Sequence, residues 1–308
     1  MDALSRIIDD IHLAGIQFLH LNCRSESSVA LDKDNCGFFH LILQGELTLV
    51  SENKKINLKQ WDVVFVPQGK PHLLQVKQAP STGCKLVLNK AFKGHSREPI
   101  NLGEGPVQAL LLSAKYRYDL ELAAPLMAAL PAFFILESKQ NTPPQWLRLG
   151  LEFLSTELGQ HLSGDQVIIN RLGDILFVQC IRNYLSQTKI EDLGWLYALR
   201  DPQLSKVIAQ LHAYPDKPWT VPELANIACM SRSAFAGRFK EVLGYPPLNY
   251  LTQHRMRLAA WLLRQEKGSI YHVAERVGYD SENAFSQAFK RVYNLTPSAY
   301  RKLDCAIS

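Results

Sequence analysis

Two histidines in the first third of the chain have side chains suited to ligand chemistry. His40 lies inside the apolar run 39–50 (FHLILQGELTLV), where a buried imidazole without a partner would be costly, and His72 opens a later strand-like run. One interpretation is that both are hydrogen-bonded core histidines. The other is a pocket that binds an effector or a soft metal such as copper, since imidazole and thiolate both suit that ion. The residue types alone leave both interpretations open.

The 6 cysteines are a second source of chemistry. They lack CxxC spacing, which argues against a structural zinc site and against a disulfide-stapled framework. Cys23, Cys36 and Cys84 fall in the same N-terminal half as the two histidines. Each is either an inert buried thiol or part of a redox switch whose oxidation changes the packing of the domain. The other three, on helices or at the tail, are interpreted as structural: Cys180, Cys229 and Cys305.

Short β-strands are predicted between residues 39 and 113, and they would position these side chains. Apolar runs on both sides of Gln44-Gly45 favour a hairpin, and turn residues separate further strand candidates. Closely spaced short strands of this kind are typical of a small barrel or sandwich. From Gln145 to Gln187 the apolar period becomes helical. These two helices either complete the core, or the second one also carries a dimer interface.

The C-terminal third contains one pattern twice. The first copy is Ser231, Phe235 and Phe239, and the second is Ser281, Phe285 and Phe289. In each copy the serine is a candidate N-cap, and the two phenylalanines lie on one face of the helix that follows. A short alanine-bearing segment precedes each helix, so each copy predicts a helix-turn-helix. A connecting helix over 248–265, about 27 Å long at about 1.5 Å per residue, would place the two second helices roughly one DNA turn apart.

Outward side chains on these helices are candidates for contacts with double-stranded DNA. Those of the second copy are Glu282, Asn283, Ser286 and Gln287. Asn and Gln pair bidentately with adenine, and Glu accepts from cytosine. The candidates for phosphate contacts, for which a solvated surface is the alternative, are Arg232, Arg238, Lys240, Lys290 and Arg291. The whole net charge of +5 lies from Asp216 onward, as expected of a segment that meets phosphates.

Length and composition bound the class of protein. With 308 residues, 47% of them hydrophobic, the chain is long enough for two globular domains. The N-terminus has no basic stretch followed by an apolar core, and the apolar run 123–136 is short and broken by prolines. We therefore expect a cytoplasmic protein that does not enter a membrane.

The spacing D-x-x-x-x-P-x-G-x-x-H from Asp62 to His72 resembles the second conserved motif of the cupin barrel, whose histidine is usually a metal ligand. Trp61 stands where that family has a glycine. Upstream, residues 32–38 contain no histidine at the positions where metal-binding cupins carry HxH and glutamate. The resemblance implies a cupin-like barrel, and a catalytic iron or zinc site with three ligands is not expected.

Roughly the last hundred residues closely resemble the DNA-binding domain of the AraC/XylS transcription regulators, over 219–251, 255–263 and 273–301. The resemblance implies that Ser233, Ala236 and Gly237 of the first copy face bases. All three are small, so we expect more of the specificity from the second copy. The N-terminal part resembles the cupin-type sensor of a branch that includes reactive-chlorine-sensing activators. By that resemblance, Cys23 and Cys84 are the pair best placed for redox sensing.

Together these patterns predict an α+β protein with a cupin-like β-barrel and an all-α domain containing two helix-turn-helix motifs. The expected segments are a sensor and dimerisation domain (1–190), a linker (191–203) and the DNA-binding domain (204–308). The expected function is a regulator, in the first instance an activator, that binds promoter DNA, works with RNA polymerase, responds to an effector, forms a homodimer and has no catalytic residues. Two alternatives are a cupin metalloenzyme with a DNA-binding appendage and an architectural DNA-binding protein.

Overall fold

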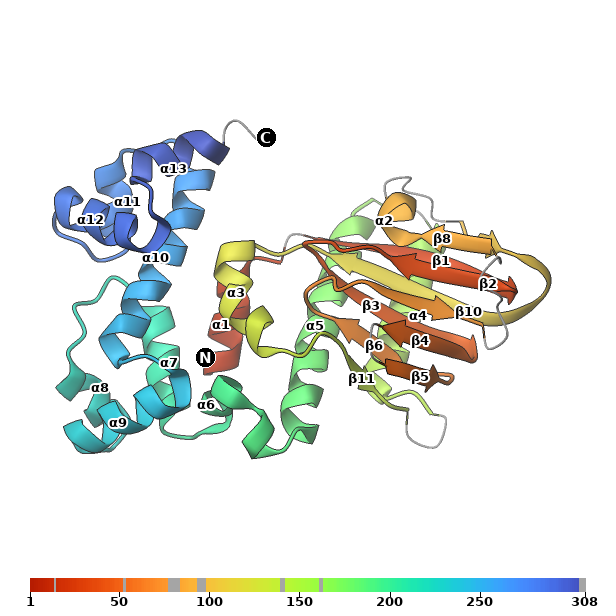
Figure 1. The fold of residues 1–308 in the computed structure, drawn as a ribbon, viewed down its shortest axis with the longest axis horizontal. Coiled ribbons are helices and arrows are strands. Elements are labelled where there is room, and N and C mark those ends of the chain that lie inside the picture. Colours follow the sequence, from red (N-terminus) through yellow and green to blue (C-terminus); the bar gives the residue numbers. More distant parts are fainter. Residues whose placement is uncertain are drawn as a thin grey trace. The chain divides into compact units, whose positions relative to one another are not determined.

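The computed structural model describes residues 1–13, 15–51, 54–76, 84–92, 98–138, 142–160 and 163–304, and the side chains of all of these except 155–160 and 303–304. Cys305 lies outside the described residues. Packing divides the chain into two compact units. One is helical and combines Met1–His12 and Asp119–Ala129 with Thr188–Ser308, and the other is rich in strands and combines Leu13–Tyr118 with Leu130–Gln187 (Figure 1).

Two sheets form the unit rich in strands. The first sheet has the order β11-β6-β3-β10-β1-β9 and contains β1 (Ile16–Ser25), β3 (Gly37–Gly45), β6 (Val63–Val66), β9 (Ile100–Leu102), β10 (Glu104–Tyr116) and β11 (Phe134–Leu136). The second has the order β5-β4-β7-β2-β8 and contains β2 (Ser27–Leu31), β4 (Leu47–Ser51), β5 (Lys54–Leu58), β7 (His72–Gln75) and β8 (Cys84–Val87). Alternate residues such as Phe38, Ile42 and Leu111 point between the sheets and form their shared core.

The predicted hairpin around Gln44-Gly45 is wrong. β3 pairs with β10 and β6, whereas β4 pairs with β5 and β7 in the other sheet. Gly45 has φ +79°, and a Cβ there would lie 2.0 Å from the carbonyl oxygen of Gln108. The glycine therefore marks a corner at which the chain leaves one sheet for the other, which two flanking apolar runs cannot distinguish from a hairpin turn.

The motif from Asp62 to His72 contains β6, the turn that follows it and the first residue of β7. The Asp62 carboxylate is 3% exposed and accepts hydrogen bonds from the backbone N–H groups of Lys59 at 3.0 Å and Ser138 at 2.8 Å. Trp61 has φ 71°, which explains why glycine suits this position. Gly69 has φ +57°, and a Cβ there would lie 2.3 Å from the Asp34 carbonyl oxygen. The aspartate before β6 and the glycine after it thus have structural roles in this part of the fold.

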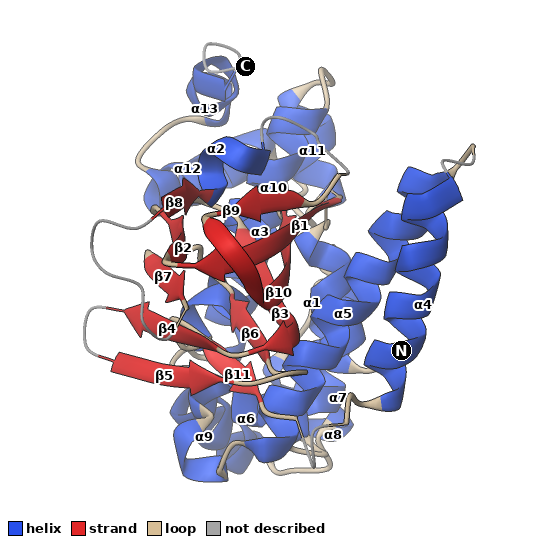
Figure 2. Ribbon diagram, turned by 90° about the vertical axis from the view of Figure 1, so that its right-hand side faces the viewer, coloured by secondary structure: helices blue, strands red, loops and turns tan. Residues whose placement is uncertain are grey.

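Helices α4 (Gln145–Gln160) and α5 (Asp165–Gln187) lie beside the six-stranded sheet, as predicted from their helical period (Figure 2). The close approach of α5 depends on Gly173, where a Cβ would lie 2.7 Å from Ile16 of β1. Phe177 of the same helix is buried, but Ile168 and Ile175 remain 41% and 50% exposed. The second helix therefore both packs on the sheet and keeps an apolar outer face.

The helical unit contains segments from both halves of the chain. Its helices are α1 (Ala3–Ile11), α3 (Leu120–Ala129), α6 (Tyr197–Arg200), α7 (Leu204–Ala213), α8 (Val221–Ile227), α9 (Arg232–Leu243), α10 (Pro247–Gln265), α11 (Ile270–Arg276), α12 (Glu282–Tyr293) and α13 (Pro297–Asp304). In the unit rich in strands, one more short helix, α2 (Leu88–Ala91), follows β8. Within the described residues, the helices are too short or too polar to cross a bilayer.

Helices α1 and α3 pack on the C-terminal helices, although both lie in the region expected to form the sensor. Ala3, Ile7 and Ile11 form the buried face of α1. From the start of α3, Glu121 accepts a hydrogen bond from Tyr293 at 3.0 Å, and Asp119 just before it pairs with Arg264 at 2.5 Å. Two segments from the first half of the sequence therefore belong to the same compact unit as the C-terminal helices.

Candidate nucleic-acid interface and sensor sites

Helices α9 and α12 are built in the same way. The hydroxyl groups of Ser231 and Ser281 cap their N-termini, accepting from the backbone N–H groups three residues later at 3.3 and 3.4 Å. Phe235 and Phe239 of α9 are fully buried, and so are their counterparts in α12, Phe285 and Phe289. From the serine through the next nine residues, exposed, half-buried and buried positions follow the same order in both helices. Both predicted second helices are thus confirmed with the same face turned outward.

The turns that precede these helices also correspond, with one difference in residue type. Met230 N–H donates to Ala225 in the first turn at 3.0 Å, and Tyr279 N–H donates to Ala274 in the second at 2.9 Å. The residue before each donor has a positive φ, and it is Cys229 (φ 52°) in one turn and Gly278 (φ 78°) in the other. The exposed Cys229 thus occupies a backbone conformation that favours glycine.

The outward positions of α9 carry small residues and positive charge. Arg232, Ser233, Gly237 and Lys240 are exposed, and Ala236 is half-buried. Arg238 is engaged inside the unit, because its guanidinium forms an ion pair with the buried Asp201 and donates to Gln203 at 3.0 Å. Asp201 in turn accepts from the backbone of Leu204 at the start of α7. Arg238 therefore anchors α9 to the segment just before α7, and this ion pair competes with the predicted phosphate contact.

The outward positions of α12 carry longer polar side chains. Glu282, Asn283 and Gln287 are exposed and Ser286 is half-buried. Lys290 and Arg291 follow in the last turn of the helix, and both are exposed. Across the described residues, no ion pair or side-chain hydrogen bond holds Arg232, Lys240, Lys290 or Arg291. These four basic groups are accordingly available to an anionic partner.

His40 and His72 lie side by side in the unit rich in strands, and hydrogen bonds fix their protons. His72 Nδ1–H donates to the Lys70 carbonyl at 2.8 Å, which leaves its Nε2 as an acceptor. His40 Nε2–H donates to that atom at 3.0 Å, and His40 Nδ1 accepts from the Ser113 hydroxyl at 2.9 Å. Burial lowers the pKa of both histidines. The two imidazoles are thus neutral and hydrogen-bonded to each other in the core.

The three cysteines of the sensor half have unequal surroundings. Cys23 is 1% exposed, and burial raises the pKa of its thiol to about 12. Cys36 is also buried, with its pKa raised to about 11 mainly by burial. Cys84 is exposed on β8 and faces Ser27 across the β2–β8 pairing, and Ser27 also forms a hydrogen bond with the Cys23 thiol. Cys23 and Cys84 are thereby neighbours of one serine, but only Cys84 is open to solvent.

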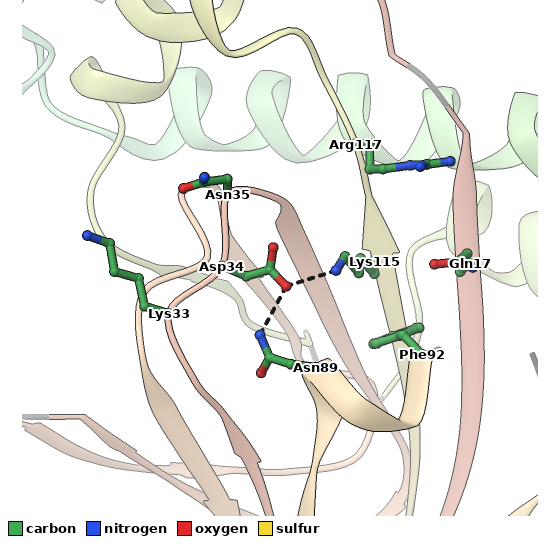
Figure 3. A pocket seen from close by; sticks show the side chains of 8 residues that line it. All are labelled: Gln17, Lys33, Asp34, Asn35, Asn89, Phe92, Lys115 and Arg117. Carbon is green, nitrogen blue, oxygen red and sulfur yellow. Dashed lines mark hydrogen bonds and ion pairs between the residues drawn. The ribbon is translucent and has the colours of Figure 1, made fainter. Parts of the chain in front are cut away.

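An open pocket of about 740 Å³ lies on the unit rich in strands (Figure 3). Asp34 is held there by Lys115 at 2.8 Å and by Asn89 at 3.0 Å. Lys33 and Arg117 add two further positive charges to its lining, which also contains Gln17, Asn35 and Phe92. The sequence did not predict this site, since its residues come from distant strands and form no motif.

The comparisons with known proteins agree with this architecture. A family model described as Cupin matches residues 2–186, and one described as Helix-turn-helix domain matches residues 224–303. The HTH-type transcriptional regulator AlkR of Acinetobacter baylyi is 37% identical over 98% of this chain and 99% of its own. The RCS-specific HTH-type transcriptional activator RclR of Escherichia coli is 30% identical over 86% of this chain and 84% of its own.

One solved structure that matches covers about a third of this chain. It is the DNA-binding domain of AdpA in complex with a target DNA, which is 34% identical, covers 35% of this chain and 96% of its own, and has a TM-score of 0.33. The predicted α+β fold, with a cupin domain before a helical domain, is confirmed by the two family matches. This chain therefore belongs to the AraC-type family of DNA-binding transcriptional regulators with an N-terminal cupin domain.

Proposed function

We propose that this protein reads promoter DNA with α9 and α12 together and regulates transcription in response to a signal received by its cupin domain. The observation that carries the proposal is the identical order of buried and exposed positions in the two helices. The connecting helix α10 has 19 residues, so it is about 28 Å long, close to one turn of DNA. One chain would then contact two successive stretches of the major groove.

The test is a salt titration of DNA binding by the full-length protein, using a site selected from a random duplex library. The variant Lys240→Ala/Lys290→Ala is expected to lower the slope of log K against log salt by about 2, because each lost phosphate contact releases about one counterion fewer. Lys206→Ala, an exposed lysine of α7, serves as the control and is expected to keep the wild-type slope. An unchanged slope in the double variant would remove α9 and α12 from the interface.

The proposed signal is either a small anionic effector or an oxidant. The first would bind the pocket that contains Lys33 and Arg117, whose positive charges favour an anion. The second would react at exposed Cys84, and the resulting sulfenic acid would condense with the Cys23 thiol to a disulfide and water. DNA binding measured with and without hypochlorous acid separates the two. Cys84→Ser is expected to abolish an oxidant response, whereas Cys36→Ser, a buried thiol, is expected to retain it.

A homodimer is also proposed, with α5 at its interface. Phe153 of α4 and Ile168 and Ile175 of α5 are 58%, 41% and 50% exposed. Apolar side chains gathered on two neighbouring helices are typical of protein–protein contacts. Ile168→Glu/Ile175→Glu is expected to shift the chain from dimer to monomer in light scattering, and Arg182→Glu, an exposed residue of the same helix, is not. A dimer unaffected by the paired glutamates would place the interface elsewhere.

Activation through RNA polymerase completes the proposal. RclR is named an activator, and the same output is proposed for this chain. The relatives are named regulators, so a metalloenzyme function is not favoured. Transcription in a purified system, with and without this protein on a promoter that contains its selected site, tests the output directly. Lower transcript levels would identify a repressor.

A further inference from the structure

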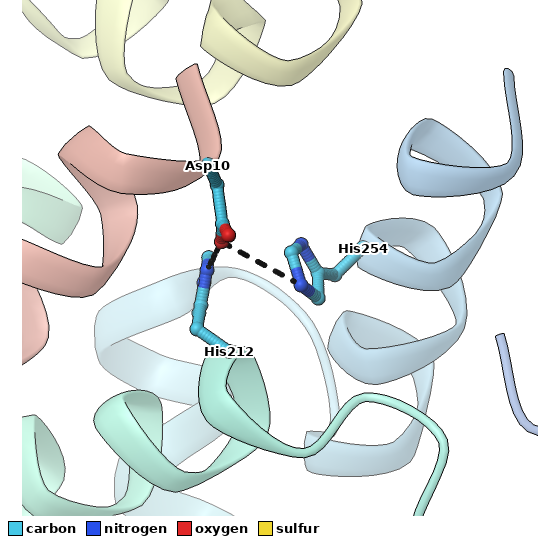
Figure 4. A group of neighbouring side chains, drawn as sticks. All are labelled: Asp10, His212 and His254. Carbon is cyan, nitrogen blue, oxygen red and sulfur yellow. Dashed lines mark hydrogen bonds and ion pairs between the residues drawn. The ribbon is translucent and has the colours of Figure 1, made fainter. Parts of the chain in front are cut away.

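Three side chains that the DNA-binding function does not use converge within the helical unit. Asp10 comes from the end of α1, His212 from the end of α7 and His254 from the middle of α10 (Figure 4). One ligand atom from each lies within 4.8 Å of the other two. All three helices belong to one compact unit, so packing of that unit alone brings the side chains together.

His254 is the residue whose surroundings point to a missing partner. It is 2% exposed, and its Nε2 atom has no hydrogen-bond partner among the described residues. The Asp10 carboxylate oxygen Oδ2 lies 3.8 Å from this nitrogen, which is too long for a hydrogen bond. Burial, together with His212, Arg257 and Arg255, lowers the pKa of His254. A buried polar atom of this kind is costly unless something binds it.

His212 is already oriented as a ligand. Its Nδ1 lies 2.5 Å from Asp10 Oδ2, and its Nε2 lies 2.8 Å from the Tyr250 hydroxyl. Burial raises the pKa of Tyr250 to about 12, so this group stays protonated and its oxygen can accept from Nε2–H. A hydrogen bond from the distal nitrogen to an outer partner is the usual way in which proteins orient a metal-binding histidine.

We propose that Asp10, His212 and His254 bind one Zn²⁺ ion. Two imidazoles and a carboxylate suit zinc, and the fourth position would be filled by water. In a tetrahedral site with bonds of about 2.1 Å, the ligand atoms lie about 3.4 Å apart. From the observed distances of 2.5 and 3.8 Å, Asp10 and His212 would separate by about 0.9 Å and His254 would close on Asp10 by about 0.4 Å.

The ion would link the N-terminal helix to the helix that joins the two DNA-reading motifs. Asp10 is partly exposed, with a side chain 27% accessible, which gives a hydrated ion a route to the site. Arg257 and Arg255 add positive charge nearby, which the carboxylate of Asp10 partly offsets. Zinc bound here would tighten the packing of α1 on α7 and α10.

The test uses the full-length protein, stripped of metal with a chelator and titrated with Zn²⁺ and, in parallel, with Co²⁺. We expect one ion per chain and a Co²⁺ spectrum of tetrahedral nitrogen and oxygen ligation, without the thiolate charge-transfer bands that the cysteines would give. His254→Gln is expected to weaken binding by at least tenfold, as is Asp10→Asn. His272→Gln, an exposed histidine of α11, is expected to bind as the wild type does.

Two further measurements distinguish zinc bound by these three residues from zinc bound elsewhere on the chain. Zn²⁺ is expected to raise the Tm of the wild type but not that of Asp10→Asn, and circular dichroism is expected to show that this variant keeps a folded helical unit. His72→Gln should leave the zinc affinity unchanged, because His40 and His72 bond to each other. Binding lost in His72→Gln but kept in His254→Gln would overturn the proposal, as would the same affinity in Asp10→Asn and the wild type.

Discussion

At the scale of single residues, α9 and α12 differ in the side chains that they expose for contacts with DNA. Asn283 and Gln287 are exposed on α12 and have both a donor and an acceptor for adenine, whereas Ser233, Ala236 and Gly237 of α9 are small. Lys240 is exposed and offers a charge without sequence information. Base preference is therefore expected to depend more on α12, and general affinity on the basic residues of both helices.

Variants of these residues are expected to change DNA binding in two different ways, in base preference or in general affinity. Asn283→Ala and Gln287→Ala should each reduce discrimination at one base pair by about 1–3 kcal/mol, while Lys240→Ala should weaken binding to all sequences alike. Binding over a panel of single-base operator variants measures both effects. The opposite ranking, with a sequence-dependent loss in Lys240→Ala alone, would contradict this division.

The buried histidine pair predicts how the stability of the cupin domain depends on pH. Burial holds the folded pKa of His40 and His72 below their usual value, so below about pH 6.5 the unfolded chain binds more protons than the folded one. The free energy of unfolding should be level above about pH 7 and should fall below about pH 6.5 by up to about 1.4 kcal/mol per pH unit for each histidine. Urea denaturation at several pH values tests this. The slope should be shallower in His72→Gln, and an equal slope in both proteins would assign the dependence to other groups.

At the scale of elements, the turn of the first helix-turn-helix places a residue other than glycine at a positive φ. Cys229 has φ 52°, where a side chain costs about 1–2 kcal/mol, and its side chain is exposed. Cys229→Gly is therefore expected to raise the free energy of unfolding by about 0.5–1 kcal/mol, after allowing for the greater freedom of glycine in the unfolded chain. Ala228→Gly is the control, since Ala228 has φ −75° and the change should destabilise the protein. Thermal unfolding of both variants decides whether the turn is strained.

In the second turn, a cysteine in place of Gly278 is expected to be destabilising. A Cβ at Gly278 would lie 2.3 Å from the backbone oxygen of Asp216, so glycine is required there by space as well as by φ. The two motifs share hydrogen bonds and a helix framework but differ in how closely other segments pack against them. The first turn has Cys229 where the second has Gly278. The close approach of Asp216 explains why the second position requires glycine.

At the scale of the whole molecule, the DNA-binding unit includes two helices from the N-terminal half of the sequence. Ile7 of α1 is 5% exposed within this unit. Ile7→Ala is expected to lower its free energy of unfolding by about 2–4 kcal/mol, because the change removes buried apolar contacts and leaves a cavity. Hydrogen exchange should then report faster opening of α7 and α10 than in the wild type, with the strands unchanged. Faster exchange confined to the strands would place α1 in the other unit.

The sequence alone determined the two helix-turn-helix motifs and the β-rich character of the first half. Serine caps, phenylalanines four residues apart and alternating apolar runs act through contacts between neighbours in the chain, so a short window contains the whole signal. The outward faces of α9 and α12 followed from the same periodicity. Arg238 is different, because Asp201, the partner that holds its guanidinium in an ion pair, lies on another segment.

Only the tertiary structure decided which distant segments meet. In the structure β3 and β4 belong to different sheets, and α1 and α3 pack with the C-terminal helices. Asp10 lies close to His212 and His254. Long-range pairing depends on how apolar faces are buried together over the whole chain, and several pairings satisfy the same local pattern. The helix-turn-helix motifs could therefore be predicted from local sequence. The three residues of the proposed zinc site come together only because three helices pack against one another.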